Sequence, residues 1–344
     1  MSVTLREVPW TDPDARALRR AQQAELSARY GDGGTPEPPA EHVVVTLLLA
    51  LDGVPVGCGS LRDLGAEPEH GPGTGEVKRV YVAPSARGRG LARTLVHALE
   101  DRAAALGWTR LVLEAGLQQP EAIGLYLSLG YAPVERYGEW ADVADSRCFA
   151  KAVGSGARGP APRSPAPAGT LRVAVVPYAD PDAAALRDAM DAESLLAYPE
   201  VEAAVATRGR FGAVDAALGS AVLVTVLARL DGRPVGCASL GRLHGSGGPA
   251  GPAGPAGLDA ATTGELRRVF VHPDVRRAGV AAALVRALEA EARALGLRDL
   301  VLETGIRQPA ALALYRSLGY RPVLPFGRWQ GDALGLYLGR TLAV

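Results

Sequence analysis

Apolar and polar positions alternate with two different periods along the first half of the chain. Apolar residues recur at three- and four-residue spacing along 14–30 and 90–106, the period of a helix with one buried face. Between these helices, short apolar runs at 43–50, 54–62 and 76–82 are separated by turn residues and are typical of strands. The pattern therefore predicts a helix, three strands and a second, longer helix.

A more apolar segment follows the second helix. The run "RLVLEAG" at 110–116 is apolar with hardly any alternation, which indicates a strand covered on both faces. Gly107 follows the preceding helix as a stop, and Pro120 begins a further helix over 120–129. A closing strand completes the order, which favours an α/β class with a mixed sheet flanked by helices.

The second half of the chain repeats the same order. Residues 264–329 align with 75–140 without a gap, with ~36 identical residues over about 66 positions, which indicates an internal duplication of a whole domain. The corresponding elements are expected at 182–197, 221–230, 234–240, 265–271, 279–295, 299–305 and 309–318. We therefore predict two α/β domains of the same fold.

A proline- and glycine-rich stretch divides the two copies. Residues 154–169, "GSGARGPAPRSPAPAG", have the composition of a semi-extended linker that cannot form a core. The predicted domains are therefore 1–153 and 170–344. The second copy also has longer loops around 200–215 and at 245–257, which we interpret as solvated surface insertions.

Charge and cysteine content narrow the class of protein. The 344 residues include 37 basic and 37 acidic side chains, so no strong overall field favours nucleic acid or an anionic membrane. Cys58 and Cys237 occupy matching places in the two copies, as small apolar residues would. No apolar run reaches the ~20 residues that span a bilayer, and no signal peptide is evident. We expect a reduced, cytoplasmic protein without disulfides that binds a small or locally charged ligand.

The joint between the third strand and the long helix combines glycine with arginine in both copies. It reads "ARGRGLA" at 86–92 and "VRRAGVA" at 275–281. The first N–H groups of a helix are unpaired and lie at the positive end of its dipole, so such a joint can bind an anion. Gly88 and Gly90 allow close backbone approach, and Arg87, Arg89 and Arg93 add charge suited to phosphate. The P-loop and dinucleotide motifs are absent, which leaves another pyrophosphate-containing ligand.

The joint and the segments that follow it resemble a known family. The pattern R-x-x-G-x-A, followed by "QPEAIGLYLSLGY" in the first copy and "QPAALALYRSLGY" in the second, is similar to the GNAT superfamily of acetyl-CoA-dependent N-acetyltransferases. The resemblance covers nearly the whole chain twice. It implies two mixed, mostly antiparallel sheets, each with a splayed central strand pair. It also implies acetyl-CoA as cofactor and an acyl-CoA-dependent N-acyltransferase as enzyme class.

The resemblance also assigns cofactor-binding residues. The two joints would hold the pyrophosphate through Arg87, Gly88, Arg89, Gly90, Leu91 and Ala92, and through Arg276, Arg277, Ala278, Gly279, Val280 and Ala281. Backbone N–H groups of the preceding strands would polarise the acetyl carbonyl at Val80, Tyr81 and Val82, and at Val269, Phe270 and Val271. Gln119 and Gln308 stand where the family commonly has asparagine near the pantetheine arm. The second copy departs from the first at Arg277 and Ala278.

Four residues carry the predicted chemistry. Glu76 and Glu265 match the family's general base, although each could instead be a structural carboxylate paired with Arg79 or Arg268. Tyr126 and Tyr315 match the tyrosine that protonates the departing thiolate, or are core tyrosines of an "LYxSLGY" helix. Glu114 and Glu303 end the buried strands. They are candidates for a second base or a substrate anchor, with a paired structural role as the alternative.

The acceptor side is less defined by sequence. In this fold the first helix and its loop line the acceptor pocket, which indicates Glu25, Arg29 and Tyr30, with Glu193 and Tyr198 in the second copy. Trp140 and Trp329 either wall the pocket or pack beneath it. No cluster of histidine and cysteine has metal-ligand spacing, so no metal is expected.

These observations lead to one main hypothesis and two alternatives. The main hypothesis is a tandem N-acetyltransferase that moves an acetyl group from acetyl-CoA to a primary amine of a small molecule or peptide, by direct attack in a ternary complex. In the first alternative only one copy, the first, is catalytic and the other is an acetyl-CoA-binding or structural module. In the second, the whole chain is an acyl-CoA sensor. The two halves of such a chain can pack as a pseudo-dimer.

Overall fold

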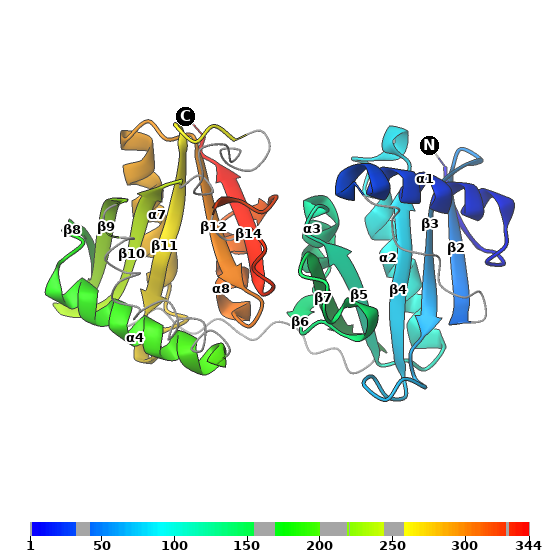
Figure 1. The fold of residues 1–344 in the computed structure, drawn as a ribbon, viewed down its shortest axis with the longest axis horizontal. Coiled ribbons are helices and arrows are strands. Elements are labelled where there is room, and N and C mark those ends of the chain that lie inside the picture. The colour runs from blue at the N-terminus through cyan, green and yellow to red at the C-terminus, as the bar shows by residue number, and fades with distance from the viewer. Residues whose placement is uncertain are drawn as a thin grey trace. The chain divides into compact units, whose positions relative to one another are not determined.

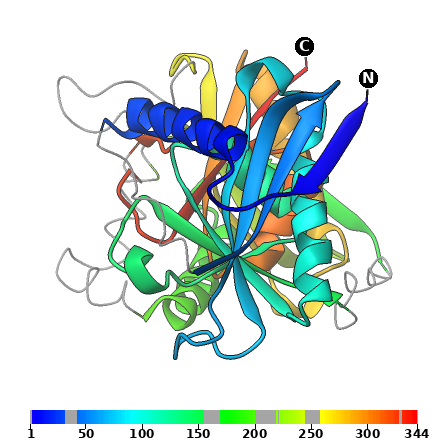
Figure 2. The ribbon, with the colours of Figure 1, turned by 90° about the vertical axis from the view of Figure 1, so that its right-hand side faces the viewer.

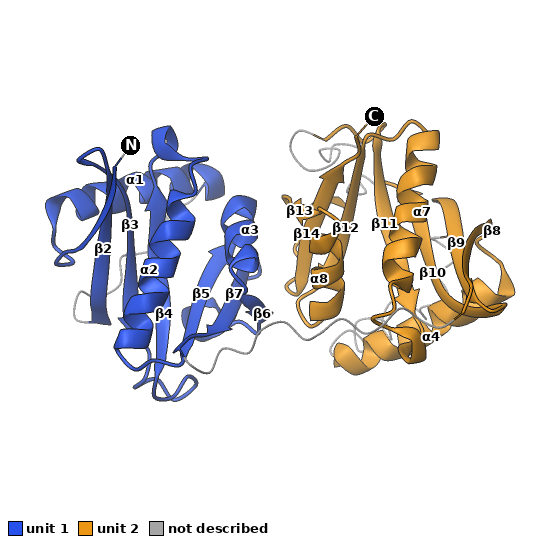
Figure 3. Ribbon diagram, turned by 180° about the vertical axis from the view of Figure 1, so that it is seen from behind, with its two compact units in different colours: residues 1–160 blue, residues 161–344 orange. Residues whose placement is uncertain are grey.

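The chain forms two compact units. The computed structural model describes residues 2–31, 42–154, 169–199, 219, 221–243, 258–327 and 330–343. Contacts divide it into Met1–Pro160 and Ala161–Val344 (Figure 3). All but the end residues of the predicted linker 154–169 lie outside the described residues, as do both longer loops of the second copy.

A seven-stranded sheet forms the centre of unit 1. Its order is β1-β2-β3-β4-β5-β7-β6, and only β4 and β5 run parallel. The strands are β1 (Val3–Glu7), β2 (Val43–Leu51), β3 (Val54–Asp63), β4 (Thr74–Val82), β5 (Arg110–Gly116), β6 (Ala132–Val134) and β7 (Ser146–Ala152). The sheet is therefore mixed and mostly antiparallel, as the sequence predicts.

Three helices cover the two faces of this sheet. They are α1 (Pro13–Tyr30), α2 (Leu91–Ala105) and α3 (Pro120–Ser128). Figures 1 and 3, taken from opposite sides, show α1 in front of the sheet and α2 behind it, and Figure 2 shows α1 crossing the strands. Asp12 begins α1 by accepting hydrogen bonds from the N–H groups of Asp14 and Ala15, and Gly31 ends it in a left-handed conformation.

Unit 2 has the same architecture. Its sheet order, β13-β14-β12-β11-β10-β9-β8, is the order of unit 1 read from the other edge. The strands are β8 (Leu171–Val176), β9 (Val222–Leu230), β10 (Arg233–Arg242), β11 (Thr263–Val271), β12 (Asp299–Gly305), β13 (Arg321–Pro322) and β14 (Gly335–Thr341). The helices are α4 (Pro181–Ala197), α7 (Val280–Ala294) and α8 (Pro309–Ser317). The predicted duplication is confirmed at the level of topology.

Two features of the sheets were not predicted from the sequence. Each unit begins with an edge strand, β1 or β8, of only five or six residues, and every residue of β1 is exposed. The single closing strand expected in each copy is a pair, β6 with β7 and β13 with β14. Strands β6 and β13 have only three and two residues, which is too few for a recognisable pattern in the sequence.

The central parallel pair is joined at one end and open at the other. Strand β4 pairs with β5 only from Thr74 to Glu76, and β11 pairs with β12 only from Thr263 to Glu265. Beyond the glutamate, β4 has a bulge where Arg79 adopts a φ of 57°. In β11, Arg268 adopts a φ of 54° at the matching bulge. Each sheet therefore has a gap whose closed end is marked by a glutamate.

The buried clusters beneath the first helices also match between the units. In unit 1, Leu18, Leu48 and Cys58 pack with Tyr81, and in unit 2 Cys237 and Phe270 occupy the corresponding core. All three cysteines are buried, and none of them forms a disulfide. Among the described residues, no helix combines the length and the apolar content needed to cross a membrane.

Candidate active site

The strand-to-helix joint of unit 1 presents an uncapped helix N-terminus. Gly88 and Gly90 both adopt a φ of 76°, which glycine tolerates and other residues rarely adopt. Gly90 is the N-cap of α2 and offers no side chain, so the first N–H groups of the helix have no side-chain cap. The space beside both glycines is open. This backbone can receive an anion such as a phosphate.

The same joint in unit 2 keeps the conformation with different residues. Gly279 is the uncapped N-cap of α7 with a φ of 85°. Arg277, which replaces Gly88, still adopts a left-handed φ of 63°. A side chain in this region costs roughly 1–2 kcal/mol relative to the right-handed conformation. The joint is therefore retained in unit 2 despite local strain.

The first arginine of each joint is bound to the first helix of its unit. Arg87 donates to the carbonyl of Val82 at 2.9 Å and pairs with Glu25 on α1 at 2.6 Å. Arg276 makes the same two contacts, with Val271 and Glu193. These guanidinium groups tie the joint to the first helix, and their contact with phosphate stays a prediction.

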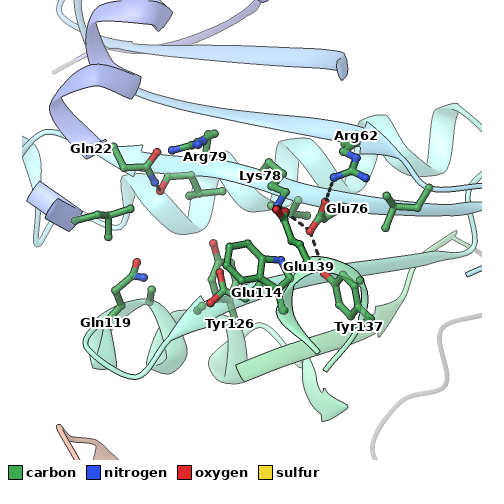
Figure 4. Close-up of a pocket in the computed structure, with 18 of the residues that line it drawn as sticks. Gln22, Arg62, Glu76, Lys78, Arg79, Glu114, Gln119, Tyr126, Tyr137 and Glu139 are labelled. Atoms are coloured by element: carbon green, nitrogen blue, oxygen red, sulfur yellow. Dashed lines mark hydrogen bonds and ion pairs between the residues drawn. The ribbon is translucent and has the colours of Figure 1, made fainter. Parts of the chain in front are cut away.

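A cavity of about 410 Å³ lies along the open gap of unit 1 (Figure 4). A volume of this size fits a small ligand or the reactive end of a larger one. Side chains from α1, β3, β4, β5, α3 and the loop before β7 line it. They include Gln22, Arg62, Glu76, Lys78, Arg79, Glu114, Gln119, Tyr126, Tyr137, Glu139 and Trp140. The predicted catalytic residues of this copy, Glu76 and Tyr126, therefore meet at one cavity.

Glu76 is held by donors from three parts of the chain. Its carboxylate lies 3.2 Å from Lys78 Nζ and 3.5 Å from Arg62 Nη1, and it accepts a hydrogen bond from Tyr137 Oη at 3.1 Å. Burial raises the pKa of Glu76, and the two cations oppose that rise. The alternative expectation of a pair with Arg79 differs from this arrangement, because Arg79 donates to Gln23 on α1 instead.

Glu114 is a second carboxyl at the same cavity and is partly buried. It follows the part of β5 that pairs with β4, so its side chain lies where the strands have separated. It accepts a hydrogen bond from Ser146 Oγ at 2.7 Å. Burial raises its pKa to about 7 against the opposing effect of Ser146. A carboxyl with this pKa can exchange a proton near neutrality.

Tyr126 and Tyr315 are equivalent buried phenols. Each is packed edge-on against a second tyrosine, with ring centroids 5.7 Å apart for Tyr126 and Tyr131. Burial raises the pKa of Tyr126, with a further rise from the charge of Glu114. The pKa of Tyr315 is raised in the same way by burial and by Glu303. Both phenols therefore retain their proton at neutral pH and can act as hydrogen-bond donors.

The first helix contributes different residues from those expected. Gln22 and Leu26, four residues apart on one face of α1, line the cavity, and Gln22 donates to the carbonyl of Val80 at 3.0 Å. Glu25, Arg29 and Tyr30 turn towards the neighbouring loops instead.

Tyr30 holds the loop that precedes α3. Its hydroxyl accepts from the N–H of Gln118 at 3.3 Å and from Gln119 Nε2 at 3.4 Å. In unit 2 the hydroxyl of Tyr198 accepts from the N–H of Arg307 at 3.0 Å. Gln119 lines the cavity, and its contact with the pantetheine arm stays a prediction. Gln308 begins α8 at the matching position.

Three cavity residues had no signal in the sequence pattern. Arg62, Lys78 and Tyr137 surround Glu76, but Arg62 is on a different strand and Tyr137 lies in the loop before β7. Only the register of β3 against β4, in which Arg62 faces Glu76, brings them together. Trp140 also lines the cavity, with Lys78 Nζ 5.0 Å from its ring centroid, whereas Trp329 lies outside the described residues.

The corresponding glutamate of unit 2 has other partners. Glu265 pairs with Arg267, two residues along its own strand, and not with Arg268, which pairs with Asp191 on α4. Gly241 replaces Arg62, and a Cβ atom at Gly241 would meet Arg267 Nη1 at 3.0 Å. Phe326 replaces Tyr137 and is fully buried. The space taken by Arg62 in unit 1 is thus occupied by Arg267 in unit 2.

Comparison with known proteins agrees with this geometry. The model of the acetyltransferase (GNAT) family matches residues 4–131 and 190–320, which is most of the chain. The chain belongs to the acetyltransferase (GNAT) family. The family and the duplicated GNAT fold expected from the sequence are confirmed.

Individual relatives match only part of the chain. An IAA acetyltransferase of Azospirillum brasilense is 42% identical over 79 residues, or 23% of this chain and 52% of that protein. The human N-acetyltransferase 8 is 42% identical over 57 residues, covering 17% of this chain and 25% of that protein. A phosphinothricin acetyltransferase from Sinorhizobium meliloti, solved with AcCoA, has a TM-score of 0.35 at 19% identity, covering 45% of this chain and 91% of that one. The chain spans about half or less of the length of these two curated relatives.

Proposed function

We propose that this GNAT protein is an N-acetyltransferase that uses acetyl-CoA, and that unit 1 transfers the acetyl group to a primary amine by direct attack. The observation that carries the proposal is the meeting of a buried carboxyl, Glu76, a partly buried carboxyl, Glu114, and a protonated phenol, Tyr126, at one cavity along the gap between β4 and β5. A module that only bound acetyl-CoA would need an anion site but no acid and base.

The joint before α2 is proposed to hold the pyrophosphate of acetyl-CoA. Its uncapped N–H groups, the open space beside Gly88 and Gly90, and family membership all support this role. The joint before α7 has the same uncapped N-terminus at Gly279. We therefore propose one cofactor site in each unit, with the acetyl end of each cofactor directed along the gap.

Glu114 is proposed to take the proton from the amine. With a pKa of about 7 and Ser146 as its described donor, it can accept a proton that an incoming ammonium group must lose. Glu76, predicted as the base from sequence, is surrounded by Lys78, Arg62 and Tyr137. Glu76 is better suited to anchoring these groups around the amine, although it remains the second candidate for the base.

Tyr126 is proposed to stabilise or protonate the leaving thiolate of coenzyme A. The amine nitrogen attacks the acetyl carbon, the carbon–sulfur bond breaks, and the electron pair goes to the sulfur of coenzyme A. The protonated phenol of Tyr126 then donates a hydrogen bond or its proton to the thiolate. The bulge at Arg79 and Val80 alters the direction of backbone N–H groups at the gap, which supports the proposed contact with the acetyl oxygen.

A second candidate function assigns catalysis to unit 1 alone. The direct pairing of Glu265 with Arg267, together with the loss of the phenol at Phe326, favours it. In this version unit 2 binds acetyl-CoA or supports unit 1 without turnover. The retained Tyr315 favours the two-site version.

The test is turnover of the full chain with acetyl-CoA and a broad panel of primary amines, followed as release of free thiol. Tyr126→Phe keeps the packed ring and removes only the hydroxyl, so kcat for the substrate of unit 1 should fall on the order of 100-fold with little change in KM. Tyr315→Phe is the matched control. If unit 2 is silent, only Tyr126→Phe affects the rate. If both units act on one amine, each single change leaves about half the rate. Near-native turnover of the double variant would show that the acid role is wrong.

A further inference from the structure

The loop between β3 and β4 of unit 1 gathers three side chains that can ligate a metal ion. Glu67, Glu69 and His70 each place one ligand atom so that all three lie within 4.8 Å of one another. Clusters of carboxylates at a protein surface are common without a bound ion. Whether this cluster can bind one therefore depends on the burial and the hydrogen bonding of His70.

His70 is buried and aims its ring nitrogen at the two carboxylates. Its side chain is only 4% exposed, with Nε2 3.9 Å from an oxygen of Glu67 and 4.0 Å from an oxygen of Glu69. Nε2 has no hydrogen-bond partner among the described residues, although a buried polar atom is normally paired. A group that fills the space between these atoms would satisfy it.

The surrounding residues fix this orientation. The ring of His70 packs edge-on against Tyr137, with centroids 4.7 Å apart, and its carbonyl accepts from Thr74 Oγ1 at 3.1 Å. Glu69 accepts a hydrogen bond from the N–H of Gly138 at 3.3 Å. The three ligand atoms are thus presented by a loop that is held at several points.

We propose that Glu67, Glu69 and His70 bind one divalent transition-metal ion such as Zn²⁺ or Co²⁺. The oxygens of Glu67 and Glu69 lie 3.9 Å and 4.0 Å from Nε2 of His70. Zinc bonds to imidazole nitrogen and carboxylate oxygen are about 2.0–2.2 Å long, so small rotations of the two carboxylate side chains towards one ion would bring all three atoms within bonding distance. One nitrogen and two oxygen ligands suit borderline metals better than Mg²⁺ or Ca²⁺, which favour oxygen alone. Binding does not depend on the proposed catalytic activity.

The position of this loop gives the ion a structural role at the acceptor side of the cavity. Glu67 pairs with Arg62, which in turn contacts Glu76. The ring packed on His70 is that of Tyr137, whose hydroxyl also reaches Glu76. An ion at this loop would hold the 138–140 segment and the partners of Glu76 in place.

Unit 2 lacks the same ligands at the matching positions. Leu258 and Asp259 stand where unit 1 has Glu69 and His70. Phe326 and Gly241 replace Tyr137 and Arg62, which link the ligands to Glu76 in unit 1. The proposal therefore predicts one ion per chain and not two.

The experiment titrates the untagged full chain, after treatment with EDTA, with Co²⁺ followed by visible absorption and with Zn²⁺ followed by calorimetry. One equivalent should bind, with a ligand-field band that reports nitrogen and oxygen coordination, and Zn²⁺ should raise the melting temperature. His70→Gln and Glu69→Gln should each weaken binding at least about tenfold. Glu69 is exposed, so its replacement should leave the fold intact.

Two histidines serve as controls. His97→Gln removes an exposed imidazole 3.4 Å from Glu100, and His272→Gln removes one 3.3 Å from Asp274 in unit 2. Neither change should alter the binding of the first equivalent. Failure of either metal to bind at micromolar concentration, or binding that persists unchanged in folded His70→Gln, would overturn the proposal. In that case His70 pairs directly with the two carboxylates.

Discussion

The two buried glutamates at the closed ends of the gaps show how the copies have diverged. Glu76 is surrounded by Arg62 from β3, Lys78 from β4 and Tyr137 from a distant loop, and the three border a cavity. Glu265 has Arg267 from its own strand, and Gly241 leaves the room that Arg267 occupies. The equivalent carboxylates thus have different kinds of partner. In unit 1 the partners come from two strands and a loop around the cavity, and in unit 2 the partner comes from the same strand.

The features that did not diverge lie on the side of each site that is proposed to hold the cofactor. Both units keep the bulge arginine with positive φ, the glycine N-cap of the long helix and the buried tyrosine. These depend on backbone conformation, which side-chain replacement alters little. The comparison indicates that the cofactor half of each site is constrained by the backbone, whereas the acceptor half is set by a few side chains that can change independently.

Replacing Glu114 should produce the largest difference between the units. Glu114→Gln keeps the shape and the contact with Ser146 but cannot accept a proton, so kcat for the substrate of unit 1 should fall about 100-fold or more. The rate of the wild-type chain should rise with pH through about 7, because the carboxyl must be ionised to act as a base. The pH profile of kcat/KM measures both effects. Glu303→Gln is the matched change and should leave this profile unaltered.

The raised pKa of Glu114 also predicts how stability depends on pH. Stability should fall over the pH range in which the rate rises. The folded-state pKa of Glu114 lies above its ordinary value of 4.5, so the folded chain binds the proton more tightly than the unfolded chain. Its contribution to stability is therefore greatest below pH 4.5 and declines as pH rises to about 7. Glu114→Gln should remove this decline from the melting temperature measured across that range. A profile unchanged by the variant would mean that another group titrates there.

An exchange of Tyr137 and Phe326 tests the partners of the two glutamates. Tyr137→Phe removes the hydroxyl that donates to Glu76 and should lower the free energy of unfolding by about 1 kcal/mol, while raising the pKa of Glu76 further. Phe326→Tyr should give no gain, since Glu265 is already paired with Arg267. Chemical denaturation of each variant measures the difference. If Phe326→Tyr stabilises unit 2 by as much as Tyr137→Phe destabilises unit 1, the proposed difference between the partners of Glu76 and Glu265 is wrong.

The smallest effect is expected at the strained joint of unit 2. Arg277→Gly relieves a left-handed side-chain residue and should raise the free energy of unfolding by about 0.5–1 kcal/mol. Gly88→Arg introduces the same strain in unit 1 and should lower it by a similar amount. Thermal unfolding of both variants, compared with coenzyme A affinity, separates the cost of strain from any contribution of the guanidinium to binding. No change in either variant would show that this position is unstrained.

The sequence predicted the parts of the molecule that depend on local pattern. The long helices, the central strands and the strand-to-helix joints follow from periodicity, glycine placement and the repeat, and Glu76, Glu114 and Tyr126 were identified before the fold was known. The edge strand β1 was missed because it is only five residues long, and its two apolar residues are too few to distinguish a strand from an irregular N-terminal segment. The partners of Glu76 were missed because they depend on strand register and on a loop 61 residues away. The proposed ligand cluster in the run "EPEH" was not considered from the sequence, because only the fold buries the side chain of His70.

The first helix of each unit has a consequence for how duplicated enzymes can specialise. Glu25 fastens α1 to the joint that follows β4, and Tyr30 fastens it to the loop that follows β5. In unit 2, Glu193 and Tyr198 repeat the two ties at the same five-residue separation, at Arg276 and Arg307. The helix therefore acts as a spacer of constant length across the opening between the strands. Because that spacing is fixed, substitutions around Glu76 or Glu265 can change which acceptor the proposed site fits. They need not alter the part of the site that is proposed to bind acetyl-CoA.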